Sequence, residues 1–114
     1  MRHLESNFQI QVVTFLRNYG FLVFAVPNSS SGKLTQRQGA LLKKEGLLAG
    51  VSDLIIVLQK RVIFAELKNL QGTGRQSDKQ KEFERAVKER GHEYVIWDSW
   101  EQIKNFIQAN IKER

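Results

Sequence analysis

The stretch that decides the fold reads GVSDLIIV at residues 50–57 and VIFAELK at residues 62–68. Both segments contain a short apolar run rich in Val, Ile and Phe, which is typical of a buried β-strand. The runs are separated by little more than Gln59, Lys60 and Arg61. So short a connection predicts an antiparallel hairpin, although Gln-Lys is not a favoured two-residue turn.

The charged side chains of this hairpin gather at one of its ends. Asp53 opens the first run, and Glu66 and Lys68 close the second. Because the start of one antiparallel strand lies beside the end of the next, we expect the three to converge, with Glu66 and Lys68 on one face. Two interpretations are open: an ion-paired cluster at a strand end, or a site for a hard divalent cation, which prefers carboxylate oxygens and keeps positions for water and phosphate. In the second, Asp53, Glu66 and the Leu67 carbonyl would bind Mg²⁺. Lys68 would then orient a water or neutralise charge on a phosphate.

The order Asp, hairpin, Glu-X-Lys resembles the signature of the PD-(D/E)XK nuclease superfamily. The segments GVSDLII, FAELK and RQSDKQ, the last at residues 75–80, resemble more particularly the VRR-NUC family of virus-type replication-repair nucleases. The resemblance runs from Glu5 to about Trp97 and covers nearly the whole chain. Ser52 stands where the family usually has proline, a residue that stiffens the backbone but binds no metal.

This resemblance implies a restriction-endonuclease-like fold and metal-dependent hydrolysis of DNA phosphodiesters, with Mg²⁺ as cofactor, Mn²⁺ as its substitute and no small-molecule cofactor. Stand-alone domains of the family resemble homodimers that resolve four-way (Holliday) junctions, so branched or duplex DNA is the expected partner. The alternatives are a flap or nicked-duplex nuclease of the same fold, a non-cleaving DNA-binding module, and a purely structural subunit. The catalytic residues expected from the hairpin and the resemblance together are Glu5, Asp53, Glu66, Lys68 and Gln80.

Two of these residues also have a simpler interpretation. Glu5 lies in the first turn of a predicted helix, where a carboxylate complements the helix dipole; the resemblance implies instead that it faces the active site. Ser77 and Gln80 have the spacing of a capping box, so the Gln80 side chain could bond only to the Ser77 amide. The resemblance implies that Gln80 faces the catalytic centre.

Apolar spacing and turn residues give the rest of the architecture. Helices are predicted at residues 4–19, 35–45 and 77–90, and a last helix opens at Ser99. A six-residue apolar run at 21–26 is expected to be the first core strand, and 93–97 the last strand, parallel to its neighbour. The sequence therefore predicts one domain, residues 1–114, with an αβαββαβα sandwich around a mixed four-stranded sheet. Four apolar residues exceed what one core face needs and could serve a dimer interface: Trp97, Trp100, Phe106 and Ile107.

Bulk composition favours a polyanionic partner. The 114 residues include 18 Lys and Arg against 12 Asp and Glu, a formal net charge of +6, which makes nucleic acid the first guess. The absence of cysteine excludes disulfides and Cys-based zinc sites and fits a reducing cytoplasm. We expect no membrane segment, and a cytoplasmic protein of a bacterial cell, of phage or host origin.

Candidate DNA contacts lie in loops and on one helix. Residues 28–33 are either a loop without a role or a phosphate-contacting loop that ends in Lys33. The helix at 35–45 carries basic side chains that form either a solvated face or one wall of a DNA groove. The DNA-binding candidates are Lys33, Arg37, Arg75 and Lys79.

Overall fold

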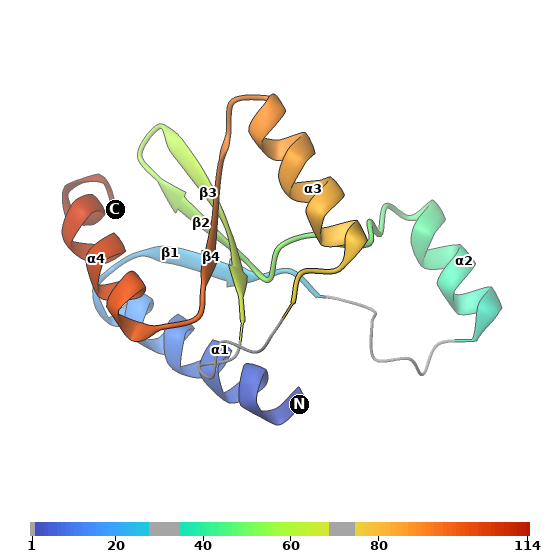
Figure 1. The fold of residues 1–114 in the computed structure, drawn as a ribbon, viewed down its shortest axis with the longest axis horizontal. Helices are drawn as coiled ribbons and strands as arrows, with labels where there is room; N and C mark the ends of the chain where they lie inside the picture. The colour runs from blue at the N-terminus through green and yellow to red at the C-terminus, as the bar shows by residue number, and fades with distance from the viewer. Residues whose placement is uncertain (1, 28–34, 69–74) are drawn as a thin grey trace.

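The computed structural model of the chain describes residues 2–27, 35–68 and 75–114, with side chains described from Asn7 onward in the first range. Its elements follow the predicted order and add a short 3₁₀ helix at the end (Figure 1). They are α1 (Arg2–Asn18), β1 (Leu22–Ala25), α2 (Gln36–Lys44), β2 (Leu54–Leu58), β3 (Arg61–Leu67), α3 (Asp78–Glu89), β4 (Glu93–Trp97), α4 (Trp100–Asn110) and η1 (Ile111–Glu113).

The predicted mixed four-stranded sheet is confirmed. The strands lie in the order β1-β2-β3-β4, antiparallel except for the parallel pair β3–β4. The hairpin between β2 and β3 turns through Gln59 and Lys60, and Lys60 adopts a φ of 67°. The favoured two-residue hairpin turns have a positive φ at both loop residues or at the first; here only the second residue, Lys60, has one, so the hairpin forms without a favoured turn.

Helices cover the two faces of the sheet unequally. On one face α1 and α4 bury a continuous core, which includes Phe8, Val12, Ile56, Ile63 and Ile103. On the other face lies α3, whose Phe83 packs edge-to-face against Phe64 of β3 and Tyr94 of β4. Figure 1 shows α2 standing apart from this body, and α2 has no buried residue. The result is an α/β sandwich with one fully covered and one partly covered sheet face.

The prediction of a buried first strand was wrong in part. Only Leu22–Ala25 of the apolar run forms β1, and β1 is an edge strand. Val23 is buried, but Leu22 is 61% and Phe24 44% exposed. Leu22 and Phe24 alternate onto the face that carries α3, and Phe83 of α3 packs on β3 and β4 instead of β1. An apolar run therefore did not imply burial on both faces.

The surplus of apolar residues near the C-terminus was also misjudged. Trp97 and Ile107 are buried in the core, and Phe106 packs against both Phe21 and Trp97. Trp100 meets aromatic rings of α1 edge-to-face. These side chains complete the core between α1, α4 and the sheet, which leaves them unsuited to an interface with a partner.

Capping boxes begin three of the helices. At each, a Ser or Thr hydroxyl accepts from the third helical amide, and the Gln at that position bonds back to the cap amide. The cap residues are Thr35 for α2, Ser77 for α3 and Ser99 for α4. The local sequence alone therefore determines where these helices start.

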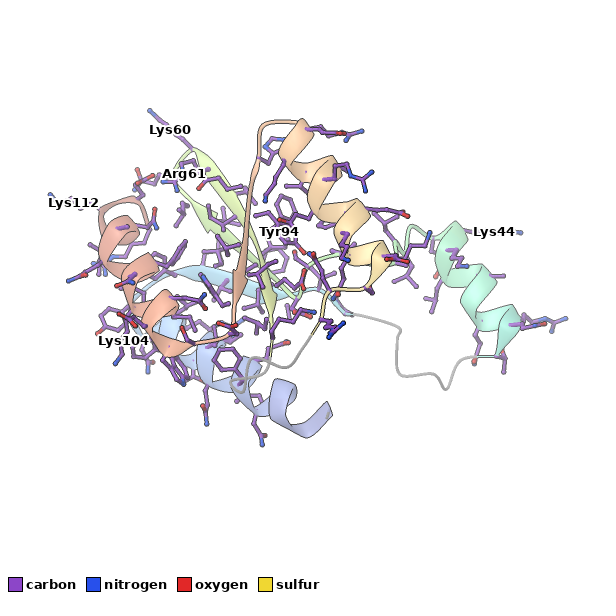
Figure 2. The ribbon with its side chains drawn as sticks, in the orientation of Figure 1. Lys44, Lys60, Arg61, Tyr94, Lys104 and Lys112 are labelled. Carbon is purple, nitrogen blue, oxygen red and sulfur yellow. The ribbon has the colours of Figure 1, made fainter. Side chains whose placement is uncertain are left out.

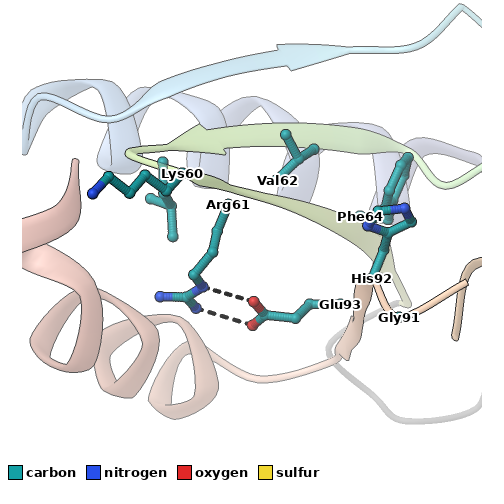
Figure 3. Close-up of a pocket in the computed structure, with 8 residues that line it drawn as sticks. Lys60, Arg61, Val62, Phe64, Gly91, His92 and Glu93 are labelled. Atoms are coloured by element: carbon teal, nitrogen blue, oxygen red, sulfur yellow. Dashed lines mark hydrogen bonds and ion pairs between the residues drawn. The ribbon is translucent and has the colours of Figure 1, made fainter.

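The hairpin end of the sheet is closed by Arg61. Its guanidinium binds the Glu93 carboxylate through two hydrogen bonds, of 2.7 and 2.9 Å (Figure 3), and also contacts Glu113 of η1. These contacts join the starts of β3 and β4 to the C-terminal turn. The hydrogen bonds that Arg61 donates to Glu93 and Glu113 raise the pKa of Arg61, and the Arg61 guanidinium lowers the pKa of Glu93 below its usual 4.5. A hollow of about 560 Å³ lies beside this cluster.

We predict that part of the acid sensitivity of the fold comes from Glu93. Because its folded-state pKa is depressed, the ion pair contributes its full stability above the unfolded pKa and loses it as the pH falls through the folded value. Thermal midpoints measured from neutral pH to well below 4.5 should fall less steeply for Glu93→Gln than for wild type. Glu45→Gln, an exposed carboxylate on the α2 cap, is the control. Parallel curves for wild type and Glu93→Gln would contradict the assignment.

Candidate active site at the end of the hairpin

The strand register brings the two predicted carboxylates together. Leu54 pairs with Ala65 across β2 and β3, so Asp53 and Glu66 occupy the next paired positions. Asp53 Oδ2 accepts a hydrogen bond of 2.7 Å from the Leu67 amide. The hairpin therefore fixes the Asp53 carboxylate against the backbone of β3, beside Glu66.

Glu66 is a fully buried charge, with 0% exposure. Its Oε1 accepts from the Tyr94 hydroxyl and, at 2.9 Å, from the Gln76 amide. Its Oε2 forms an ion pair of 2.9 Å with Lys68 Nζ and has no further hydrogen-bond partner. Burial and the Glu66 carboxylate both raise the pKa of Tyr94, so the phenol stays protonated as a donor.

The donor set fits a hard divalent cation. A buried carboxylate oxygen needs a polar partner, and Glu66 Oε2 has the Lys68 ammonium, while Asp53 is the next carboxylate at this end of the hairpin. Mg²⁺ is held in proteins by one or two carboxylates and keeps several waters. In the described part of the chain no three His, Asp or Glu side chains form a metal-sized cluster. The described side-chain ligands would thus be Asp53 and Glu66, and the Leu67 carbonyl stays a predicted ligand.

Lys68 connects the hairpin to the start of α3. Its Nζ donates to the Arg75 carbonyl at 3.0 Å and to Gln80 Oε1 at 3.3 Å. The same Gln80 oxygen accepts from the Ser77 amide at 2.8 Å. Gln80 therefore serves as a capping residue and also contacts Lys68, so the two interpretations of its role are compatible.

The remaining predicted residues lie farther from these contacts or outside the described positions. Arg75 touches Lys68 through its main chain, and Lys79 is an exposed side chain 3.7 Å from Glu82. Arg37 is exposed on α2. Glu5 belongs to α1 but its side chain is not among those described, and Lys33 lies outside the described residues.

Three residues at the site escaped the sequence analysis: Tyr94, Gln76 and Glu84. Gln76 Nε2 donates to Glu66 Oε1 and, at 2.8 Å, to Glu84 Oε1, and Lys88 in turn contacts Glu84. Hydrogen bonds from Lys88 and Gln76 lower the pKa of Glu84. A usable signal existed for Tyr94, because a parallel strand beside Glu66 was predicted and a tyrosine in it needs a polar partner.

Comparison with known proteins identifies the fold. A solved structure described as a VRR_NUC domain protein superimposes with a TM-score of 0.72 and 22% sequence identity, over 96% of this chain and 89% of the other. The chain has the fold of a VRR-NUC domain. The resemblance noted in the sequence is thereby confirmed at the level of the fold. No protein-family model matches the chain, and no curated protein matches it.

Within this VRR-NUC fold, Gly50 lets the segment before β2 approach α3. Gly50 has a φ of 89°, and a Cβ placed there would lie 2.3 Å from the Lys79 carbonyl oxygen. Only glycine accommodates both the left-handed conformation and the contact. The approach sets the first turn of α3, which carries Gln80, against the entry to β2, which carries Asp53.

We predict that Gly50→Ala lowers the free energy of unfolding more than Gly91→Ala does. Gly91 has a similar φ of 83°, but a Cβ there would meet no described atom within 4 Å. Gly91→Ala should therefore cost only the left-handed penalty of about 1–2 kcal/mol, while Gly50→Ala adds a clash with backbone. Denaturant unfolding of both variants measures the difference. Equal losses would show that the contact with α3 is not tight.

Proposed function

We propose that this chain is a divalent-metal-dependent endonuclease that hydrolyses DNA phosphodiesters. The observation that carries the proposal is the buried Glu66 carboxylate, with one oxygen free of hydrogen bonds, placed beside Asp53 on a VRR-NUC fold. A structural cluster would be expected to satisfy both oxygens of a fully buried carboxylate. The nuclease fold supports DNA as the substrate class.

Each residue of the site has a distinct task in this proposal. Asp53, Glu66 and the Leu67 carbonyl hold Mg²⁺, for which Mn²⁺ substitutes. When bound, the ion lowers the pKa of a water and neutralises charge on the phosphate. Lys68 is nearly buried, with 11% of its side chain exposed, and stands between Glu66 and Gln80. Its ammonium is placed to orient the attacking water or the scissile phosphate, and Gln80 holds it there.

Binding to DNA is proposed to be mainly electrostatic. The net charge is +6, and α2 carries Arg37, Lys43 and Lys44 on its exposed surface. Figure 2 shows Lys44 pointing away from the body of the molecule. Arg75, whose main-chain carbonyl accepts from Lys68, precedes α3, and Lys79 is exposed in the first turn of that helix. These cations suit contacts to phosphates, which position a duplex without reading its sequence; Lys33 and Glu5 keep their predicted roles at DNA and metal.

We further propose a homodimer that cuts four-way junctions in the cytoplasm of a bacterial cell. One metal site cuts one strand, and a two-fold dimer presents two sites to a two-fold substrate. One observation supports a dimer. On the part of the sheet that α3 does not cover, three apolar side chains are exposed on one face: Leu22, Phe24 and Val62. Exposed apolar side chains of this kind can pack against the same side chains of a second copy, whereas the charged backbone of DNA offers them no apolar partner.

Two other functions remain to be separated by experiment. A flap or nicked-duplex nuclease would use the same site on a different branched DNA, so rates on a panel of four-way junctions, flaps and nicked duplexes distinguish it. A non-cleaving module would bind DNA through the same cations and cut none of these substrates with Mg²⁺ or Mn²⁺. The exposed cations alone do not favour cleavage; the Asp53–Glu66–Lys68 arrangement does.

We predict that Asp53→Asn, Glu66→Gln and Lys68→Met each abolish cleavage of DNA while leaving most DNA affinity intact. Each change removes a charge at nearly constant volume, and circular dichroism checks that each variant is folded, because Lys68→Met leaves the buried Glu66 without its cation. Gel assays of cleavage with Mg²⁺, and of binding without it, measure the two effects. Lys60→Met, an exposed lysine at the far end of the hairpin, is the matched control and should cut normally. Efficient cutting by any of the three variants, or by wild type in EDTA, would refute the mechanism.

We also predict that the bare half of the sheet mediates dimerisation. Light scattering should give twice the chain mass for wild type and the chain mass for Leu22→Lys. Ile10→Lys on α1 is the matched control, because Ile10 and Leu22 are both 61% exposed, and it should stay dimeric. A monomeric wild type, or a dimeric Leu22→Lys variant, would contradict this interface.

A further inference from the structure

The two oxygens of the Glu66 carboxylate have different surroundings. Oε1 accepts from two neutral donors, the Tyr94 hydroxyl and the Gln76 amide, while Oε2 faces Lys68 without a hydrogen bond. Rotation about the terminal bond of a glutamate side chain is broad and only roughly two-fold. Nothing in Glu66 itself therefore selects this orientation, and the selection comes from its neighbours.

Tyr94 approaches Glu66 from the neighbouring parallel strand. It belongs to β4 and lies in the interior between the sheet and α3, with 8% of its surface exposed (Figure 2). Its ring packs against Phe83, with the ring centroids 6.1 Å apart. The packing fixes the ring, so the hydroxyl is aimed at Glu66 Oε1 and has little freedom to follow a rotated carboxylate.

Gln76 approaches from the segment just before the Ser77 cap of α3. Its Nε2 lies 2.9 Å from Glu66 Oε1 and 2.8 Å from Glu84 Oε1. Both neighbours are carboxylate acceptors, so the NH₂ group must face them and uses one hydrogen for each. Glu84 is itself held by Lys88, 2.5 Å away on the same helix. Gln76 is therefore held by Glu84 of α3 and connects this helix to Glu66 through hydrogen bonds.

We propose that Tyr94 and Gln76 are positioning residues that orient the Glu66 carboxylate for a divalent cation. By binding Oε1 together, they direct Oε2 toward Lys68 and Asp53, where the proposed metal would bind. The inference rests on the proposed function and adds to it two residues that would touch neither metal nor DNA. Hydrogen-bond partners of metal-binding carboxylates typically contribute about 10- to 100-fold in metal affinity.

The test is Mn²⁺ binding to the full-length protein without DNA, by calorimetry and electron paramagnetic resonance. Tyr94→Phe removes only the hydroxyl and keeps the ring contact with Phe83; we expect Mn²⁺ to bind about 10- to 100-fold more weakly. Tyr19→Phe makes the same change at the other tyrosine of the chain, which is 42% exposed on the surface, and should bind Mn²⁺ like wild type. Gln76→Leu should weaken binding similarly.

Positioning is separated from a structural role by rescue with metal. Glu66 is intact in Tyr94→Phe and Gln76→Leu, so saturating Mn²⁺ should restore cleavage in both, but not in Glu66→Gln. Should Tyr94→Phe fail to fold, Gln76→Leu decides the question, because Gln76 is only half-buried and lies outside the core.

Three results would overturn the inference. If wild type binds Mn²⁺ and the two variants bind it equally well, the inference fails while the proposed function stands. If the variants stay inactive at saturating Mn²⁺, their role is structural. If wild type binds no Mn²⁺, the proposed function fails and the inference with it.

Discussion

A carboxylate completely removed from water organises this molecule. Burying the charge of Glu66 without compensation would cost several kcal/mol, and three elements supply the compensation. β4 contributes Tyr94, the segment entering α3 contributes Gln76, and the residue that follows β3 contributes Lys68. The parallel pairing of β3 with β4 and the docking of α3 are thus tied to one side chain. Of its two oxygens, Oε1 accepts two hydrogen bonds and Oε2 is compensated by the ion pair with Lys68.

The two ends of the sheet use charge in opposite ways. At the hairpin end, Arg61 pairs with Glu93 and Glu113 in partial contact with solvent, where ion pairs contribute little individually but tie three elements together. At the other end, Asp53 and Glu66 lie beside each other with the ammonium of Lys68 and neutral donors around them. Like charges placed at the same end of a sheet repel each other, so stability alone gives no reason for the pair. The hollow of about 560 Å³ at the hairpin end is therefore a weaker candidate for an active site than the charged side chains around Glu66.

This chain and the solved VRR_NUC domain share a fold although only 22% of their residues are identical. The core that α1 and α4 form with one sheet face requires apolar residues at regular spacing, and many sequences satisfy that requirement. A fold does not imply a function, which depends on the side chains of the site and their chemistry. On the opposite face, Leu22 and Phe24 stay exposed, a feature that the packing of the core does not explain.

The sequence by itself determined what depends on neighbouring residues: the helix starts at Thr35, Ser77 and Ser99, the hairpin, and, through its register, the meeting of Asp53 with Glu66. Capping and strand pairing act over a few residues, so local patterns suffice to predict them. Tertiary structure alone decided which apolar residues are buried and which donors reach Glu66. Leu22 is exposed because α3 lies over the other half of the sheet, and Tyr94 contacts a carboxylate 28 residues away in the sequence. Such contacts follow from how helices pack on a sheet, a choice that is made by the whole core and not by any short segment.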